Sequence, residues 1–208
     1  MRYLLAVVVV AVLAIPLTLL AQQGGVTAEG WQARLDRGGE AASVLSFMTM
    51  GSGVHATTAS AGAAIFWEPS SMTKGSYTIS ASFTQAEPSN HSNAYGLFFG
   101  GSDLAGANQR YSYFVIRQDG QFLIKKRMGS ETPTVVDWTG HEAINELDAE
   151  GKSTNTLAVE VGGSQVRFLV NGTEVSTQPR SAVDTGGITG LRVTHFLNVH
   201  IDNLMLGM

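Results

Sequence analysis

Two tyrosines and an arginine recur at alternate positions of Tyr111–Gln118, and their types suit recognition of a sugar. Successive side chains of an extended chain point to opposite faces, so Tyr113 and Arg117 fall on one face and Phe114 and Ile116 on the other. The second pair is apolar and is typical of a core. A flat ring packs against the C–H face of a sugar, and a guanidinium offers a planar fork of hydrogen-bond donors. We therefore predict a saccharide-binding surface on the Tyr113 side.

The following segment, Gln121–Arg127, extends this surface, because Lys125 and Arg127 share one of its faces. The Asp119-Gly120 turn is typical of a tight hairpin and pairs the two segments. We add Tyr95 and Trp138 as further rings. The sequence leaves open an ordinary solvent-exposed face with tyrosine packing and charge pairs across the hairpin. The predicted ligand-binding residues are Tyr95, Tyr113, Arg117, Lys125, Arg127 and Trp138.

Carboxylates show no catalytic pattern. Hydrolysis of a glycoside usually needs two carboxylates about 5–10 Å apart, and within the predicted strands no E-x-D run places such a pair on one face. Asp119 is accounted for by the turn, and the acids of 142–150 suit a solvated helix face. Active-site partners need not be neighbours in the sequence, so an enzyme is not excluded. We predict binding without catalysis and assign no catalytic residue.

The histidines and one polar loop are the remaining candidates for metal ligands. No H-x-x-x-H or H-x-H spacing suggests zinc. His195 and His200 flank a turn and are expected to be adjacent, and His200 shares a strand face with Asp202. Asp103 and the nearby Asn108 carry oxygen ligands that suit calcium, but the acid count is low. We predict no metal site and no cofactor, with calcium as a minor alternative.

Composition excludes several classes of protein. The chain has 208 residues, and its 13 Lys and Arg against 17 Asp and Glu give a net charge of −4, which does not favour a nucleic-acid partner. It contains no cysteine, which excludes thiol catalysis, cysteine-ligated zinc and iron–sulfur clusters.

The N-terminus has the layout of a secretory signal. Arg2 supplies positive charge, the uncharged apolar run Leu4–Ala21 follows, and Ala21 suits cleavage. Such a run is also long enough to be an uncleaved membrane anchor. No second run of this kind follows, so we expect no membrane span after signal cleavage. We predict a bacterial protein that is secreted, periplasmic or at the cell surface.

The rest of the chain predicts strands, because alternating segments recur between Gly, Asn, Asp and Ser. Asn171-Gly172 is a second tight hairpin turn. Only His141–Glu150 favours one or two helical turns. The fold class is therefore all-β, a two-sheet antiparallel β-sandwich, with residues 1–21 as signal peptide, 22–41 as lead-in and 42–208 as the domain. The expected strands are Ala42–Met50, Gly62–Trp67, Ser76–Gln85, Tyr95–Gly100, Tyr111–Gln118, Gln121–Arg127, Thr156–Val161, Gln165–Val170, Thr173–Thr177, Ile188–Thr194 and Asn198–Leu206.

Several of these segments resemble a known family pattern. They include YGLFFGG at Tyr95–Gly101, NQRYSYFVIRQDGQFLIKKRMG at Asn108–Gly129 and VRFLVNGTEV at Val166–Val175. Together they resemble secreted bacterial proteins with a concanavalin A/laminin-G-like jelly roll, similar to the 3-keto-disaccharide hydrolase-like domain family. The resemblance implies a jelly roll and a sugar-related role outside the cytoplasm.

Three functions are therefore expected, in this order. The first is a secreted domain that binds a carbohydrate or glycoconjugate, with a saccharide or cell-surface glycan as partner. The second, implied by the resemblance, is a 3-keto-glycoside hydrolase-like enzyme. The third is a structural or adhesive cell-surface protein, which high Gly content and low charge permit.

Overall fold

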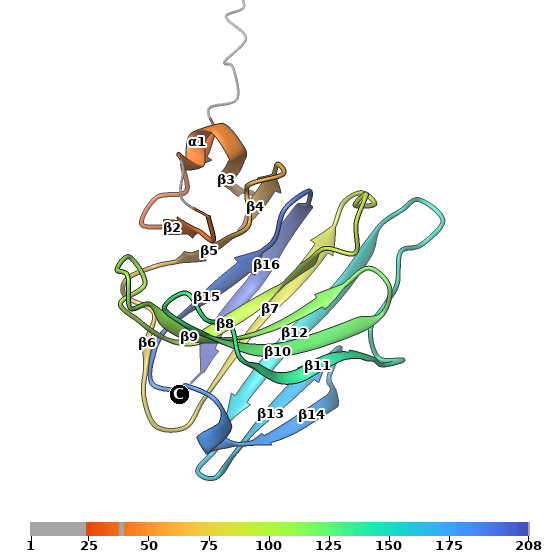
Figure 1. Cartoon of the computed structure of the whole chain (residues 1–208). Coiled ribbons are helices and arrows are strands. Elements are labelled where there is room, and N and C mark those ends of the chain that lie inside the picture. The colour runs from red at the N-terminus through yellow and green to blue at the C-terminus, as the bar shows by residue number, and fades with distance from the viewer. Residues whose placement is uncertain (1–23, 38–39, 208) are drawn as a thin grey trace, which may run out of the picture.

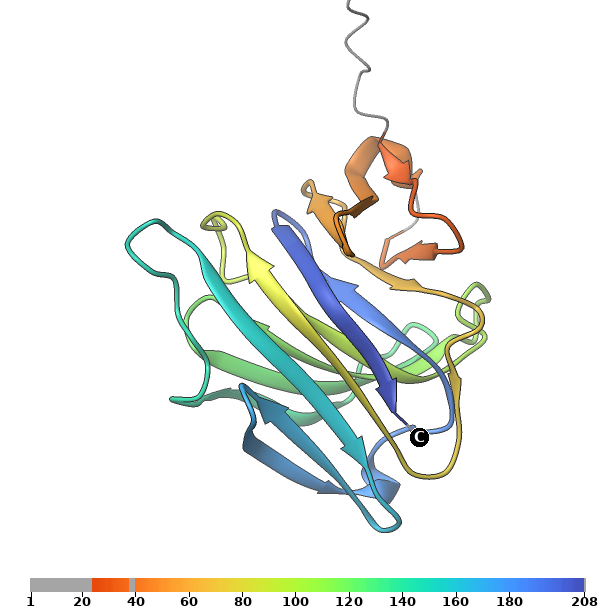
Figure 2. The same ribbon diagram turned by 180° about the vertical axis from the view of Figure 1, so that it is seen from behind.

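The computed structural model describes residues 24–37 and 40–207, which form two β-sheets packed face to face. We call them sheet A and sheet B, and the strands of each are given below. Sheet B lies toward the viewer in Figure 1, and sheet A lies toward the viewer in Figure 2. All strand pairs are antiparallel except β1 with β3. Sheet A runs in the order β1 (Gly25–Val26), β3 (Leu45–Met50), β4 (Gly53–Thr58), β16 (Asn198–Gly207), β7 (Tyr77–Gln85), β12 (Ser153–Val161), β13 (Gln165–Val170) and β14 (Thr173–Pro179).

Sheet B carries the predicted binding strands. A short strand, β6 (Met72–Thr73), also pairs with strand β15 (Gly187–Val193) of this sheet. The two short helices are α1 (Ala41–Val44) and η1 (Arg180–Ala182). Sheet B runs in the order β11 (Thr134–Gly140), β10 (Gln121–Met128), β9 (Arg110–Arg117), β8 (Ala94–Ser102), β15 (Gly187–Val193), β5 (Ala64–Trp67) and β2 (Gln32–Leu35). The predicted two-sheet antiparallel sandwich is confirmed.

Alternation of side chains explains the strands of sheet A. In β7, Tyr77, Ile79, Ala81 and Phe83 are buried, and the residues between them are partly exposed. Burial of one face is the main driving force for such a strand. The interior between the two sheets holds the core of the molecule.

Sheet B is buried on both faces in its central strands. Phe114 and Ile116 of β9 face the interior, as predicted, and are fully buried. Tyr111 and Tyr113 face outward yet are only 1% and 6% exposed. A second apolar layer therefore lies on the outer side of this sheet, and other side chains cover it.

The backbone angles of the hairpin turns agree with the residue types found there. Asn171 and Gly172 adopt φ angles of 50° and 81°, and Gly120 adopts 73°. Asn171-Gly172 is a two-residue turn between the paired Val170 and Thr173, and such a turn requires positive φ angles at both residues. The turn between the paired Arg117 and Gln121 has three residues, 118–120, and Gly120 supplies its positive φ. The register between β9 and β10 is continuous, so each outward residue of β9 has an outward partner on β10.

Two sequence expectations differ from the structure. The segment 141–150 forms turns and no helix, because Asn145 and Asp148 bind backbone groups of residues 152–154 and compete with helical hydrogen bonding. The predicted lead-in 22–41 contributes β1 and β2, which pair with β3 and β5. The sandwich therefore includes part of the lead-in.

The predicted signal peptide, residues 1–21, lies outside the described residues. Among the helices of the described ranges, none has the length and apolar character needed to cross a membrane.

Candidate functional site

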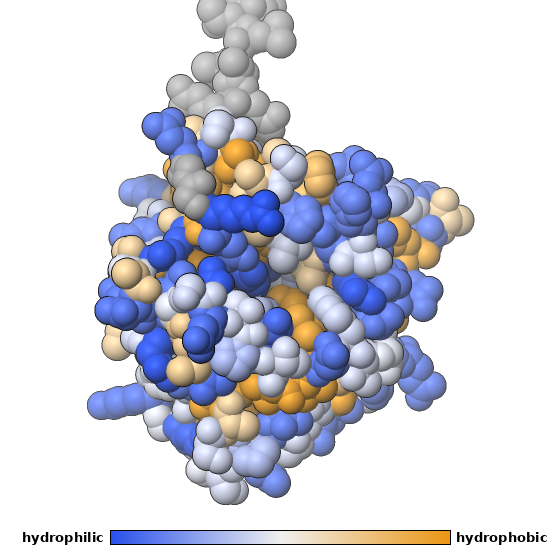
Figure 3. All heavy atoms as spheres, viewed as in Figure 1, coloured by the Kyte–Doolittle hydropathy of each residue, from blue (hydrophilic) through white to orange (hydrophobic). Residues whose placement is uncertain are grey.

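The outer face of sheet B has an apolar floor. We use "outer face" for the side of sheet B that points away from the sandwich interior. Figure 3 shows the molecule from the side of sheet B, where apolar residues appear between hydrophilic ones. Phe98 and Tyr111 contact each other, with ring centroids 5.4 Å apart, and Tyr111 lies 5.9 Å from Tyr113. The floor consists of Ile65, Trp67, Ala94, Phe98, Leu104, Tyr111, Tyr113, Val115 and Leu123.

A buried arginine covers the two tyrosines. Arg192 of β15 lies with its guanidinium carbon 4.7 Å from the centroid of the Tyr113 ring, and its Nη1 is 3.3 Å from the Tyr111 hydroxyl. Both of its terminal nitrogens donate to the carboxylate of Asp36, at 3.0 and 2.5 Å. Such a two-point pair fixes the arginine as well as neutralising it.

Two more arginines approach the same carboxylate. Arg34 of β2 donates to the carbonyl oxygens of Leu104 and Gly106, which ties the loop after β8 to the outer face. Arg127 of β10 reaches Asp36 at 3.9 Å. Burial acts to raise the pKa of Asp36, but the charges of Arg192, Arg127 and Arg34 outweigh it and hold that pKa below its usual range. Asp36 is therefore ionised at neutral pH.

Trp138 of the edge strand β11 supplies the partly exposed ring of this face. The guanidinium carbon of Arg117 lies 4.3 Å from the centroid of its ring. Arg117 in turn donates from Nε to Asp119 Oδ1 at 2.7 Å. The turn at Asp119 thus orients Arg117, and Arg117 supports one face of the indole.

A cleft of about 400 Å³ opens beside this tryptophan. Trp138 and Asp36 both line it, and Ala94 of the apolar floor lies in its lining. The remaining lining residues are mostly small or polar and can donate or accept hydrogen bonds. They are Arg37, Ser60, Ala61, Ala63, Ser92, Asn93, Thr194, His195 and Phe196.

Four predicted residues share the outer face with Tyr113. Lys125 pairs with Tyr113 across the β9–β10 register, and Arg127 pairs with Tyr111. Arg117 and Trp138 contact each other, as described above. The Tyr113 ring lies beneath Arg192, so it supports that side chain and is not an open platform.

Tyr95 does not join this face. It pairs with Ile116 in the β8–β9 register, so it points into the interior of the sandwich. Its ring packs 5.5 Å from that of Phe83 and is 1% exposed. We correct its assignment from a surface ring to a core residue.

The sequence argument missed Asp36, Arg34 and Arg192. Asp36 and Arg192 are 156 positions apart, and no local pattern links them. The alternation of Arg192 with the buried residues Leu191 and Val193 is the one available signal. This pattern indicates an arginine on the face of a buried strand that points away from the core.

His195 lines the cleft beside Trp138, whereas His55 of β4 and His200 of β16 lie on sheet A. His200 pairs with Asp202 at 3.0 Å, as the shared strand face predicted. His200 lies near His55, with ring centroids 5.9 Å apart, and His195 lies near His91 instead of His200. The expected contact between His195 and His200 is absent from the described residues, and these residues include no group of three or more ligands placed to hold a metal ion. Asp103 accepts a hydrogen bond from the backbone of Asn108.

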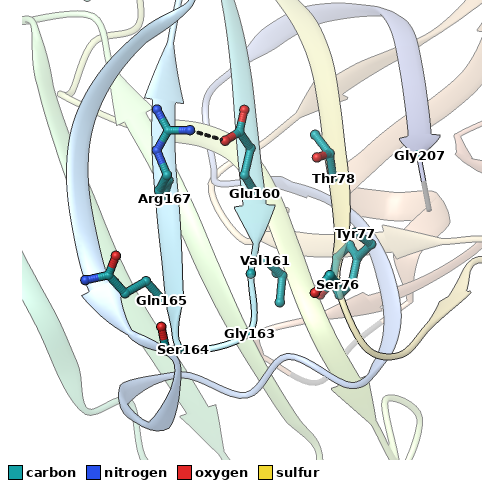
Figure 4. Close-up of a pocket in the computed structure, with 11 residues that line it drawn as sticks. Ser76, Tyr77, Thr78, Glu160, Val161, Gly163, Ser164, Gln165, Arg167 and Gly207 are labelled. Atoms are coloured by element: carbon teal, nitrogen blue, oxygen red, sulfur yellow. Dashed lines mark hydrogen bonds and ion pairs between the residues drawn. The ribbon is translucent and has the colours of Figure 1, made fainter.

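A larger hollow, of about 630 Å³, lies over the ends of β7, β12 and β13 on sheet A. Figure 4 shows its polar lining, in which Arg167 points toward Glu160. Arg167 donates to both Glu160 and Glu174 at 2.6 Å, so two of its three nitrogens are already engaged. The one aromatic residue in its lining, Tyr77, is 4% exposed. This hollow lacks the exposed ring that the cleft beside Trp138 has.

Several solved structures have a similar fold over most of this chain. The carbohydrate-binding module CBM66 from Bacillus subtilis is similar over 89% of this chain and 99% of its own, with 12% identity and a TM-score of 0.62. A glycoside hydrolase family 16 endo-glucanase from Bacteroides ovatus matches 85% of this chain and 94% of its own, with 11% identity and a TM-score of 0.58. The fold is a concanavalin A-like jelly roll.

A protein with a galectin-like fold from Bacillus subtilis is also similar, with 12% identity and a TM-score of 0.56 over 85% of this chain and 88% of its own. No family model and no curated protein sequence matches the chain. At these identities the likeness is one of fold, and the function has to be argued from the site.

Proposed function

We propose that the protein is a secreted saccharide-binding domain that holds its ligand in the cleft between Trp138 and Asp36. The observation that carries the proposal is the partly exposed Trp138 ring, supported from one side by Arg117 and bordered by a cleft with polar walls. A ring of this kind buries much area at low entropy cost, and the polar groups around it bind hydroxyls.

The similar structures support this choice of ligand. One is named as a carbohydrate-binding module and another as an endo-glucanase, so the fold is used for saccharides in both a binding protein and an enzyme. The cleft itself favours binding over hydrolysis. A glycosidase needs a carboxyl that donates a proton, and the carboxylate lining the cleft, Asp36, is held ionised by its arginines.

The 3-keto-glycoside hydrolase remains the second candidate on the strength of the sequence resemblance. Incubation with 3-keto-glycosides separates the two, because a binding domain releases no sugar.

The binding proposal is tested with a glycan array followed by calorimetric titration of the best ligand. Trp138→Ala is expected to weaken binding by about tenfold or more, because aromatic anchors dominate such contacts. Trp138→Phe keeps a ring and is expected to retain part of the affinity. Thr173→Ala, at an exposed position of β14 in the other sheet, is the control and should bind as the original chain does. An array without saccharide binding, or full affinity in Trp138→Ala, would refute the proposal.

A further inference from the structure

The outer face of sheet B carries more positive than negative charge. Five basic side chains lie on it, and two carboxylates, Asp36 and Asp119, pair with them. This surplus belongs to a chain whose net charge is −4, so the face has the opposite sign to the molecule as a whole. A local surplus of this kind attracts ligands of the opposite charge. The five are Arg34, Arg117, Lys125, Arg127 and Arg192.

Three of the five are already engaged. Arg192 uses both terminal nitrogens on Asp36, Arg34 donates to two backbone carbonyls, and Arg117 is held by Asp119 and Trp138. These contacts hold the three side chains in place on the outer face. The other two basic side chains are the least engaged and are therefore the first candidates for contact with a ligand.

Arg127 and Lys125 are those two. Within the described residues, Arg127 Nε is buried without a hydrogen-bond acceptor, and the one ion pair of this side chain spans 3.9 Å. Lys125 is partly exposed, and no ion pair or side-chain hydrogen bond links it to a described residue. A buried donor without an acceptor is costly, so an arriving anionic oxygen would relieve that cost.

Lys125 and Arg127 lie on β10, and Trp138 lies beside them on the neighbouring strand β11. Arg127 and Lys125 are two residues apart, which corresponds to about 7 Å along a strand. Phe122, closer to the other end of β10, pairs with Thr139, the neighbour of Trp138. A sugar ring on Trp138 would thus direct the following residue of an oligosaccharide toward Lys125 and Arg127.

We infer that the saccharide is anionic, with a carboxylate or sulfate held by Lys125 and Arg127 while a ring packs on Trp138. This inference rests on the proposed function and narrows it to a class of ligand. Carboxylate and sulfate present the same anionic oxygens to a guanidinium and an ammonium. The two sources are separated by the choice of probe.

The test titrates the full chain with two matched pairs of oligosaccharides. Oligogalacturonate is compared with its methyl ester, and dextran sulfate with dextran. We expect at least one anionic probe to bind about tenfold more tightly than its neutral partner, with affinity that falls as salt rises. The pair that shows the difference identifies carboxylate or sulfate as the group.

Variants locate the contact. Lys125→Gln is expected to weaken binding of the anionic probe by about tenfold. Lys152→Gln removes the same charge at an exposed position before β12 of the other sheet and should change affinity less than twofold. Arg127→Lys keeps the charge but lacks Nε, and it is expected to weaken binding severalfold.

The outcomes separate this inference from the proposed function. Neutral probes that bind as tightly as the anionic ones, still in a Trp138-dependent way, would overturn the anionic class and leave saccharide binding intact. Equal losses in Lys125→Gln and Lys152→Gln would show a general charge effect and also overturn it. Absence of binding by all four probes and by the glycan array would overturn both.

Discussion

Arg192 and Asp36 form a two-point ion pair that joins the end of β2 to β15 and covers Tyr113. The arginine side chain is 9% exposed and the aspartate side chain 26%. The pair therefore shapes the outer face of sheet B, and it places the charge of Arg192 over an apolar floor, where that charge depends on Asp36 as its counter-ion.

Removal of the carboxylate should destabilise the fold. Asp36→Asn leaves Arg192 buried without its counter-ion, and breaking a buried pair in this way costs about 3–5 kcal/mol. Urea unfolding measures the loss. Asp119→Asn, at the more exposed pair with Arg117, is the comparison and should cost less than about 1 kcal/mol. Equal losses in the two variants would contradict the structural role given to Asp36.

Acid should remove the contribution of the Asp36–Arg192 pair to the stability of the fold. The pKa of Asp36 is lower in the folded chain than in the unfolded chain, so its contribution to stability is present above the unfolded value of roughly 4 and is lost as pH falls through the folded value. Unfolding midpoints measured from about pH 5 to pH 2 are expected to fall more steeply for the original chain than for Asp36→Asn. Parallel curves would mean that Asp36 titrates normally.

His55 should titrate below the ordinary range. Burial lowers its pKa, and the neighbouring His200 lowers it further against the opposing effect of Asn198. The unfolded chain then binds a proton more readily, so stability is full above about pH 6.5 and falls as pH drops through the folded pKa. NMR titration of the His55 ring measures the pKa directly. A folded-state pKa at or above 6.5 would contradict this reading.

A methyl group at Gly96 should disturb the packing of β8 on β9. A Cβ there would meet the carbonyl oxygen of Phe114 and lie 2.9 Å from Val115 Cα. Forced overpacking of this kind costs about 1–3 kcal/mol. Gly163→Ala is the matched control, because nothing lies within 4 Å of a Cβ at that position. Thermal unfolding of the two variants compares them, and a similar change in both would argue against the close approach at Gly96.

Period-2 reasoning predicted the part of the site that one hairpin supplies. Tyr113, Lys125 and Arg127 share a face because β9 and β10 are joined by a tight turn, and such a turn fixes the register. The prediction for Tyr95 was wrong because β8 is joined to β9 by the longer loop 103–109 and not by a tight turn. The sequence does not specify that register, which pairs Tyr95 with the core residue Ile116.

Asp36 and Arg192 could not be predicted as part of the candidate site for a related reason. Their contact depends on the pairing of β2 with β5 and of β5 with β15, and each pairing brings together segments that are far apart in the chain. The two-sheet architecture required only the alternation of apolar residues within segments, so it could be predicted. The charged layer over sheet B required knowledge of which segments become neighbours.

The position of β16 has a consequence for the order of assembly. This strand comes late in the sequence but lies between β4 and β7, so it is the only link through sheet A between β1, β3 and β4 and the other strands described. As the polypeptide emerges from the ribosome, the early strands have no docking place in that sheet until residues 198–207 arrive. Closure of sheet A is therefore expected to be a slow, post-synthetic event dominated by contacts between distant parts of the chain.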